Sequence, residues 1–384
     1  MGGPVSPPWD ELWERPDRLR GPWRYLYPAL QDLGPEELQT RASELAHWLR
    51  EHGVTYQVYG DPTPRPWGLD LLPLPLDSRE WATVEAGLIQ RAELLSRLLA
   101  DLYGRRTVLR RGLLPAEALF VDPAFLRPCH GLAPSLPLYG ADLVRRPDGR
   151  LQVVADRTQV PSGMGYTLEN RLALSRLLPS LHREARVHPL NPFFRTLRDS
   201  LAALAPEQRD DPQVVVLTPG PEHETFFEQA FLADQLGWVL AQGSDLTVRD
   251  GRLWRKTLDG LRSVDVVLRR VDDAWCDPLE LRGDSLLGVP GLLQAVRQGT
   301  VAVANPLGSA LLESPALLPF LPGLCRQLLG EELRLPQTPA WWCGLPSHRS
   351  QVLERLPELV VDSLYREPGF PVTPAQLDQD AYAT

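Results

Sequence analysis

Three short apolar runs constrain the fold of this chain more than any other feature. They read QVVVL at Gln213–Leu217, VDVVLR at Val264–Arg269 and VAVA at Val301–Ala304. Near-continuous apolar strands of this length are typical of parallel sheets that helices cover on both faces. The first run leads through TPGPEHET into a helical pattern with acidic residues at its start, which makes one α/β unit. The sequence therefore predicts an α/β protein with a Rossmann-like α/β subdomain.

Length and composition limit the classes of protein that this chain can belong to. It has 384 residues, a formal net charge of −9, four scattered cysteines and a single lysine, Lys256, among its 40 basic residues. The length predicts two or three packed units. The acidity disfavours nucleic acid or an anionic membrane as a partner. Because the chain shows neither a signal peptide nor a bilayer-spanning run, we expect a cytoplasmic protein with reduced thiols.

Changes in composition divide the chain into four regions. Residues 1–137 form an N-terminal region, helical and irregular, in which a long helix is predicted from about Glu80 to Leu102. Residues 138–209 hold a central hairpin, loop and helix. Residues 210–335 form the α/β subdomain, and residues 336–384 form a C-terminal tail.

The central region places many polar side chains between a strand end and a helix start. Leu138–Arg145 and Leu151–Ala155 read as two strands joined by a Pro-Asp-Gly turn. Amides at such strand-to-helix junctions commonly point outward and bind ligands. We therefore interpret the following residues as candidate substrate contacts: Arg157, Ser162, Gly163, Tyr166, Glu169, Asn170 and Arg171. The alternative is an exposed ion pair beside an ordinary helix cap.

Two carboxylates on the hairpin are candidate metal ligands. Asp142 lies on the first strand and Asp156 at the end of the second. Residues on antiparallel strands can face the same side, and paired carboxylates suit Mg²⁺. The alternative is that Asp142 pairs with a neighbouring arginine.

Polar residues also follow the buried strands of the α/β subdomain. Arg269 and Arg270 are candidate catalytic residues, because paired arginines match carboxylate and phosphate groups. Since side chains alternate along a strand, only one of the two can easily face a cleft. Further candidate contacts are Thr218, Glu222, Asp272, Asp273 and Asn305. The alternatives are a salt-bridge network for the arginines and helix capping for the glutamate.

Four long motifs resemble the circularly permuted type 2 ATP-grasp family, which is related to the synthetase half of glutathionylspermidine synthase. They are VVADRTQVPSGMGYTLENR, VVVLTPGPEHETFFEQAFLA, LRRVDDAWCDPLELRGDSLLGVPGLLQAV and ANPLGSALLESPALLPFLP. The resemblance covers roughly Leu26 to Pro357. It implies an ATP-grasp-like fold and an ATP-dependent carboxylate–amine ligase that works through an acyl phosphate with ATP and Mg²⁺.

The chain departs from the pattern of this family at the implied metal site. The resemblance places a Glu-x-Asn pair that holds Mg²⁺ where this chain has Ala155 and Arg157. The implied upstream metal ligand matches Asp142, which is kept. The ADRTQ form is similar to that of a subgroup whose longer members carry an appended helical domain.

The implied nucleotide site also departs from the pattern of the family. A lysine expected in LLESPALL, near Pro315, is absent, and Asp362 stands roughly where a second lysine is expected. Lys256 matches neither position. Family members continue beyond the position of Thr384, so we expect an incomplete nucleotide lobe.

Two functions follow from these patterns. The first is an ATP-grasp ligase, or a component of one, that acts on a small-molecule or peptide substrate, with a partner chain completing the nucleotide lobe. The second is a non-catalytic relative that binds a peptide or a partner chain. In both, the hairpin, loop and helix are expected at the wall of the main cleft. The isolated chain is expected to bind Mg-ATP weakly or not at all.

Overall fold

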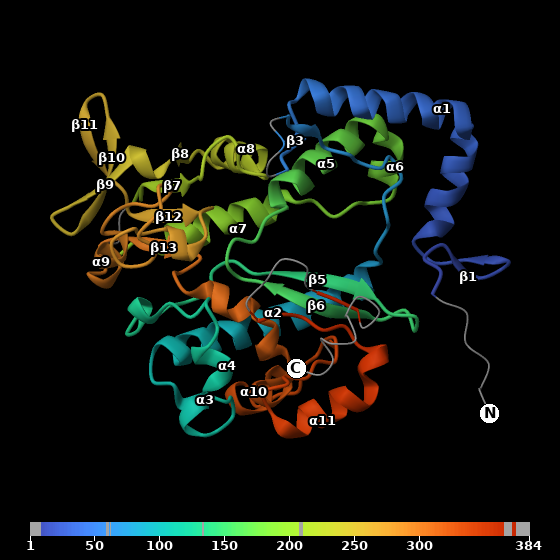
Figure 1. The fold of residues 1–384 in the computed structure, drawn as a ribbon. Coiled ribbons are helices and arrows are strands. Elements are labelled where there is room, and N and C mark those ends of the chain that lie inside the picture. The colour runs from blue at the N-terminus through green and yellow to red at the C-terminus, as the bar shows by residue number, and fades with distance from the viewer. Residues whose placement is uncertain are drawn as a thin grey trace.

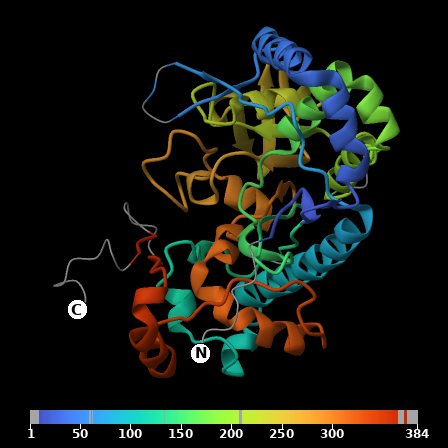
Figure 2. The same cartoon turned by 90° about the vertical axis from the view of Figure 1, so that its right-hand side faces the viewer.

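The computed structural model describes residues 9–58, 61, 63–132, 134–206, 210–364 and 371–373. Figure 1 shows an upper part with a parallel sheet and its helices, and a lower part built mainly of helices. A two-stranded hairpin lies between them. The side view in Figure 2 shows the same division, with the long helix α2 (Ser78–Tyr103) crossing the lower part.

The parallel sheet contains the three predicted apolar runs. Its strands are β7 (Val214–Leu217), β8 (Val239–Ala241), β12 (Val266–Arg269) and β13 (Ala302–Ala304), in the order β13-β12-β7-β8 and all parallel. Helices α7 (Asn191–Ala202) and α8 (Phe226–Leu236) pack on one face, and α9 (Leu292–Arg297) packs on the other. The predicted α/β fold class is confirmed, because these runs are covered on both faces.

The order of the strands creates a switch point between β7 and β12. The chain leaves β7 toward β8 on one side and later places β12 on the other side of β7. Ligands of open α/β sheets usually bind outside the carboxyl ends of strands at such a point. Thr218 and Arg270, which directly follow β7 and β12, therefore lie where the fold would place a ligand.

The central hairpin joins the two parts. It pairs β5 (Gly140–Arg145) with β6 (Leu151–Arg157) through a turn in which Gly149 has a φ of 85°. One face packs on α2, where Val84, Val153 and Leu335 form a small apolar cluster. The outer edge of β6 is covered by residues 336–338, since Val153 exchanges two backbone hydrogen bonds of 2.9 Å with Pro336 and Thr338.

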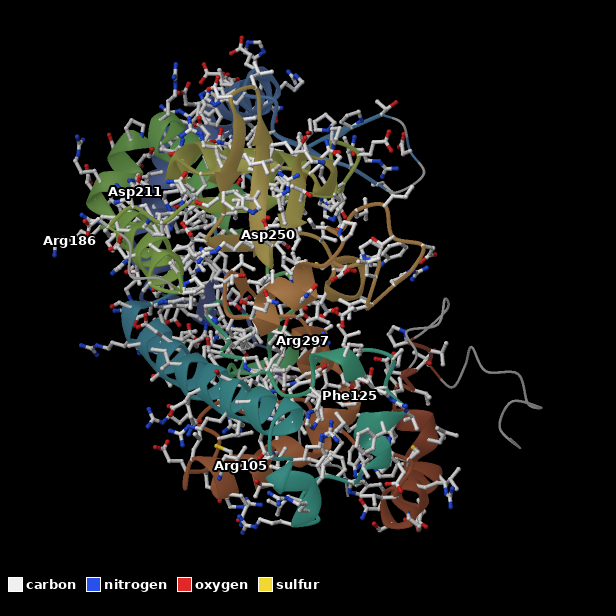
Figure 3. The ribbon with its side chains drawn as sticks, turned by 90° about the vertical axis from the view of Figure 1, so that its left-hand side faces the viewer. Arg105, Phe125, Arg186, Asp211, Asp250 and Arg297 are labelled. Atoms are coloured by element: carbon white, nitrogen blue, oxygen red, sulfur yellow. The ribbon has the colours of Figure 1, made fainter. Side chains whose placement is uncertain are left out.

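A small antiparallel sheet projects from the parallel one. It is formed by β9 (Leu246–Arg249), β10 (Arg252–Thr257) and β11 (Gly260–Ser263), in the order β11-β10-β9. A tight turn joins β9 and β10, with a φ of 53° at Asp250, which Figure 3 labels.

Helices and short elements complete both parts. The N-terminal stretch forms β1 and β2, and α1 begins at Trp23 and bends at Gly34. The remaining elements are as follows: β1 (Trp13–Arg15), β2 (Arg18–Leu19), α1 (Trp23–Glu51), β3 (Thr55–Tyr56), β4 (Arg65–Pro66), α3 (Thr107–Arg110), α4 (Glu117–Phe120), η1 (Arg127–Cys129), α5 (Met164–Leu177), α6 (Pro179–Glu184), η2 (Gly243–Asp245), η3 (Asp273–Trp275), η4 (Ser309–Glu313), η5 (Pro315–Phe320), α10 (Leu321–Leu328), α11 (Pro346–Arg355) and η6 (Leu356–Glu358).

The largest core belongs to both parts of the molecule. Leu95 and Leu98 of α2 share one buried cluster with Val267 and Val303 of the parallel sheet. Burial of this apolar surface couples the lower helices to the sheet. Within the described part of the chain, none of the helices has the length and apolar character needed to cross a membrane.

Candidate functional site

The loop that joins β6 to α5 fills the space where the fold would place a ligand. Glu313 Oε1 accepts hydrogen bonds from the amides of Thr158 (2.7 Å) and Gln159 (2.6 Å). At the other end, Glu228 Oε1 accepts from the amides of Gly163 (2.7 Å) and Gly165 (2.9 Å). The amides expected to contact a ligand are therefore bonded to carboxylates of the chain itself.

Arg270, which follows β12, contacts both this loop and Glu228. Its Nη1 donates to the carbonyl oxygen of Pro161 over 2.7 Å, and its Nη2 lies 3.6 Å from Glu228 Oε2. Its side chain is only 1% exposed, and burial lowers the pKa of the guanidinium. The loop and Glu228 enclose Arg270, so its guanidinium does not face a cleft.

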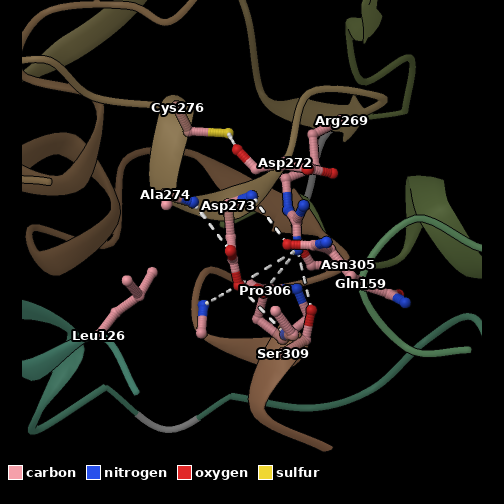
Figure 4. A network of polar contacts seen from close by, with 12 residues as sticks. Leu126, Gln159, Arg269, Asp272, Asp273, Ala274, Cys276, Asn305, Pro306 and Ser309 are labelled. Carbon is pink, nitrogen blue, oxygen red and sulfur yellow. Dashed lines mark hydrogen bonds and ion pairs between the residues drawn. The ribbon is translucent and has the colours of Figure 1, made fainter. Parts of the chain in front are cut away.

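Arg269 points to the opposite side of the sheet, as its place in the strand predicts. Its guanidinium bonds to the carbonyl oxygens of Asn305 (2.7 Å), Val271 (3.0 Å) and Pro306 (3.2 Å), and to Ser309 Oγ (2.9 Å). Figure 4 shows Arg269 beside Asn305, Pro306 and Ser309. The side chain is fully buried. Arg269 therefore holds the turn after β13, and the salt-bridge alternative describes both arginines better than a cleft-facing role.

Asp273 and Asn305 belong to the same network. Asp273 Oδ2 accepts from the amides of Gly308 (3.0 Å) and Ala310 (3.1 Å) and lies 4.0 Å from Arg269 Nη2. Asn305 Nδ2 donates to the carbonyl oxygens of Leu138 (2.7 Å) and Thr158 (2.6 Å). Both side chains are buried and do not face a substrate. Asn305 fastens the ends of the hairpin to the sheet, and Asp273 holds the turn after β13.

The residues after β7 divide into a buried and an exposed group. Thr218 is buried, and its hydroxyl donates to Gln229 Oε1 over 2.6 Å. His223 lies beside them, with its Nδ1 3.0 Å from Gln229 Nε2, and burial lowers the pKa of its imidazole. Glu222 is exposed, as are Asp272 and Ser162 elsewhere in the region. The structure therefore does not bring the predicted contacts together around one cavity.

The predicted contacts on α5 face other parts of the protein. Tyr166 is stacked on Trp67, with ring centroids 4.3 Å apart, and Trp67 Nε1 donates to Asn170 Oδ1 over 3.0 Å. Glu169 Oε1 lies 3.0 Å from Nδ1 of His52, the residue that follows α1. Arg171 Nη1 donates to the carbonyl oxygen of His188 over 3.1 Å. These four side chains join α5 to its neighbours.

Asp142 and Asp156 do not share a face of the hairpin, so the expected metal pair is not formed. The register shifts by one residue at Leu143, so that Asp142 lies opposite Ala155 and Asp156 opposite Ala141. A shift of one residue turns a side chain to the other face. Asp156 therefore faces α2, where both its oxygens accept from Arg91 over 2.7 Å and Oδ1 also accepts from Tyr139.

The outer face of the hairpin carries Asp142, Ala155 and Arg157. Arg157 Nη2 donates to Asp142 Oδ2 over 2.5 Å, and this hydrogen bond raises the pKa of the guanidinium. The two side chains remain 53% and 45% exposed. The residues implied to hold Mg²⁺ thus do not fit a divalent cation, because they offer a single carboxylate, one oxygen of which is already bonded to an arginine. The described residues contain no group of three potential ligands elsewhere.

The side chains near the implied nucleotide-binding positions also bond to the protein itself. In LLESPALL the charged side chain is Glu313, which bonds to loop amides. Lys256 Nζ donates to the carbonyl oxygen of Ser244 over 2.8 Å in the projecting sheet. Two hollows of about 290 and 270 Å³ lie beside α2, one near Arg334 and one near Trp9. Neither is lined by the loop after β6.

Some of the residues that hold this region together were not predicted from the sequence. Glu228 and Glu313 were not singled out, and neither was Arg91. The available signal was a charged residue on an otherwise apolar helical face, as in FFEQAFLA around Glu228 and GLIQRAELL around Arg91. A buried charge of this kind requires a partner, but the spacing does not identify it.

Comparison with known proteins places the chain among relatives that are mostly longer. Residues 73–383 match the family described as circularly permuted ATP-grasp type 2. The uncharacterized protein Rv2567 of Mycobacterium tuberculosis is 43% identical over 370 residues, which cover 92% of this chain and 42% of that protein. The uncharacterized protein sll0335 of Synechocystis is 37% identical over 368 residues, covering 94% of this chain and 76% of that protein.

A solved structure supports the fold alone. The apo form of a glutathione synthetase-like effector from Globodera pallida has a TM-score of 0.53 and 17% identity, covering 80% of this chain and 71% of that chain. This chain spans about two fifths of the length of the mycobacterial relative. The family match and the identities together establish that the chain belongs to the circularly permuted type 2 ATP-grasp family.

Proposed function

We propose that this chain is a non-catalytic member of its family that binds a peptide or a partner chain. The observation that carries the proposal is the outer face of the β5–β6 hairpin. Asp142, Ala155 and Arg157 share this face, and a guanidinium nitrogen of Arg157 lies 2.5 Å from Asp142 Oδ2. The guanidinium takes the place of a cation at Oδ2, and the one remaining carboxylate oxygen is too few ligands for Mg²⁺.

The surroundings of the switch point support the same proposal. Phosphoryl chemistry needs cationic groups and amides that can reach the phosphates. Here the loop amides are bonded to Glu228 and Glu313, and Arg269 and Arg270 are bonded to the protein itself. Each of these groups would have to break a buried interaction before it could contact a nucleotide.

A second candidate function is a component of an ATP-dependent carboxylate–amine ligase. Membership of the family favours it, since this family generally binds ATP and Mg²⁺, and Asp142 stands at the implied metal position. A partner chain would then supply the nucleotide contacts. This candidate requires Arg157 to leave Asp142 when the partner binds.

Isothermal titration calorimetry with ATP in excess Mg²⁺ tests the proposal. The wild-type chain should give no saturable heat at micromolar ATP, because the phosphate and metal contacts are missing. Asp142→Asn is the matched control, because it should behave in the same way. One-to-one binding at micromolar ATP that depends on Mg²⁺ and disappears in Asp142→Asn would contradict the proposal and favour the ligase component.

A further inference from the structure

The two outer edges of the β5–β6 hairpin differ in how their backbone groups are used. Leu143 and Val153 lie opposite each other in the register. Val153 donates to the carbonyl oxygen of Pro336 and accepts from the amide of Thr338, both over 2.9 Å. The backbone N–H and C=O groups of Leu143 on the outer edge of β5 have no hydrogen-bond partner among the described residues. One edge is therefore bonded to an extended segment, and the other has no backbone partner within the described ranges.

The direction of each backbone group on β5 follows from the turn. Arg146 donates its N–H to the carbonyl oxygen of Arg150 (2.9 Å) and accepts from the amide of Gly149 (2.8 Å), so its groups point toward β6. These directions alternate along a strand. Ala141, Leu143 and Arg145 therefore point their N–H and C=O groups away from β6. A row of such groups is a template for another strand.

The side chains beside this edge indicate what strand it would accept. Asp142 and Val144 lie on the outer face, two residues apart. Asp142 Oδ1 has no partner in the described part of the chain, and Val144 is 43% exposed. A strand added to β5 would place one residue opposite each of them. Opposite charges and apolar pairs stabilise such cross-strand positions.

We propose that the edge of β5 binds an extended segment of a second polypeptide. That segment carries a basic residue opposite Asp142 and an apolar residue, two positions away, opposite Val144. The strand forms backbone hydrogen bonds with Ala141, Leu143 and Arg145, as residues 336–338 do with Val153 on the other edge. This inference rests on the proposed function and specifies its partner and its binding site.

The test is amide hydrogen exchange with a synthetic probe. The probe is the capped peptide Thr-Val-Thr-Lys-Thr-Val-Thr, in which lysine and both valines share a face in either strand direction. At saturating peptide, exchange of the amides of Ala141, Leu143 and Arg145 should slow by about tenfold or more, as for newly formed strand hydrogen bonds. The amide of Val144, which faces β6, should not change.

Two controls separate strand pairing from simple attraction. A peptide N-methylated at alternate residues keeps the side chains but cannot form the ladder, so it should give no protection. Replacing lysine with glutamate should weaken binding about two- to fivefold, and Asp142→Lys should reverse this preference. These variants change only exposed side chains and leave the fold in place.

Several results would overturn the inference. They are no protection at millimolar peptide, equal protection by the N-methylated peptide, or protection at Leu261 of β11 instead. Protection without peptide in a concentration-dependent dimer would show that a second copy covers the edge. None of these results bears on nucleotide binding, so failure here is distinguishable from failure of the proposed function.

Discussion

Two arginine–carboxylate pairs of this protein lie in opposite environments. Arg270 and Glu228 are buried at the switch point of the parallel sheet, with 1% and 0% of their side chains exposed. Arg157 and Asp142 lie on the outer face of the hairpin, with about half of each side chain exposed. A buried pair cannot lose one member without leaving an uncompensated charge, whereas an exposed pair exchanges easily with water. The buried pair therefore serves the fold, and the exposed pair is accessible to a ligand.

The largest expected effect comes from breaking the buried pair. Glu228→Gln keeps the shape and an oxygen acceptor for the amides of Gly163 and Gly165 but removes the charge opposite Arg270. The free energy of unfolding should fall by about 3–5 kcal/mol, measured by urea denaturation. Asp142→Asn is the matched control on the exposed pair. A loss below about 1 kcal/mol for Glu228→Gln would show that the two pairs are equivalent.

The second effect concerns the network around Arg269. Arg269→Lys keeps the charge but loses the planar fork that reaches Asn305, Val271, Pro306 and Ser309. Thermal and urea unfolding should show a loss of about 2–4 kcal/mol, because buried carbonyl groups lose their donors. Wild-type stability with weaker binding of an acidic ligand would restore the substrate role predicted from the sequence.

A pH effect is expected beside the buried pair. Burial lowers the pKa of His223, and its Nδ1 lies 3.2 Å from the amide of Thr225, so the folded state favours the neutral ring. As the pH falls through the ordinary histidine value of about 6.5, the unfolded chain takes up the proton first. Stability should therefore decrease between pH 7.5 and 5.5 by more in wild type than in His223→Gln. The exposed His47→Gln serves as the control, and identical slopes in wild type and His223→Gln would contradict the account.

The smallest effect on stability belongs to the exposed pair. Arg157→Gln should change the free energy of unfolding by less than about 1 kcal/mol, because exposed ion pairs contribute little. Urea denaturation in low and high salt measures this change. A loss as large as that of Glu228→Gln would mean that the outer face of the hairpin is structural and not available to a partner.

The fold could be predicted from the sequence more completely than the candidate site. The runs that became β7, β12 and β13 consist mainly of valine, leucine and alanine, and α2 carries the regular spacing of a buried helix, so local patterns sufficed. The polar loop after β6 was ambiguous, because ligand-binding and internally bonded amides have the same local sequence. Glu228 and Glu313 decide between them, and they lie 65 and 155 residues away from the amides of Gly163 and Thr158.

A shift of one residue in strand register separates the two aspartates that were predicted to share a face. Without the register shift at Leu143, Asp142 would lie opposite Val154, and Asp156 would share its face. One extra residue in β6 moves Asp156 to the side of α2 and Arg91. Nothing in LQVVADR distinguishes a strand with a bulge from a regular one, because valine and alanine suit either conformation.

The central claim is that Arg157 takes the place of a metal ion on the outer face of the hairpin. Electron paramagnetic resonance with Mn²⁺ tests it on wild type, on Ala155→Glu/Arg157→Asn, and on the same double variant with Asp142→Asn added. We predict that wild type leaves the signal of free Mn²⁺ unchanged. The double variant should bind one ion, and the added Asp142→Asn should abolish that binding. Binding of one Mn²⁺ by wild type that is lost in Asp142→Asn would contradict the claim.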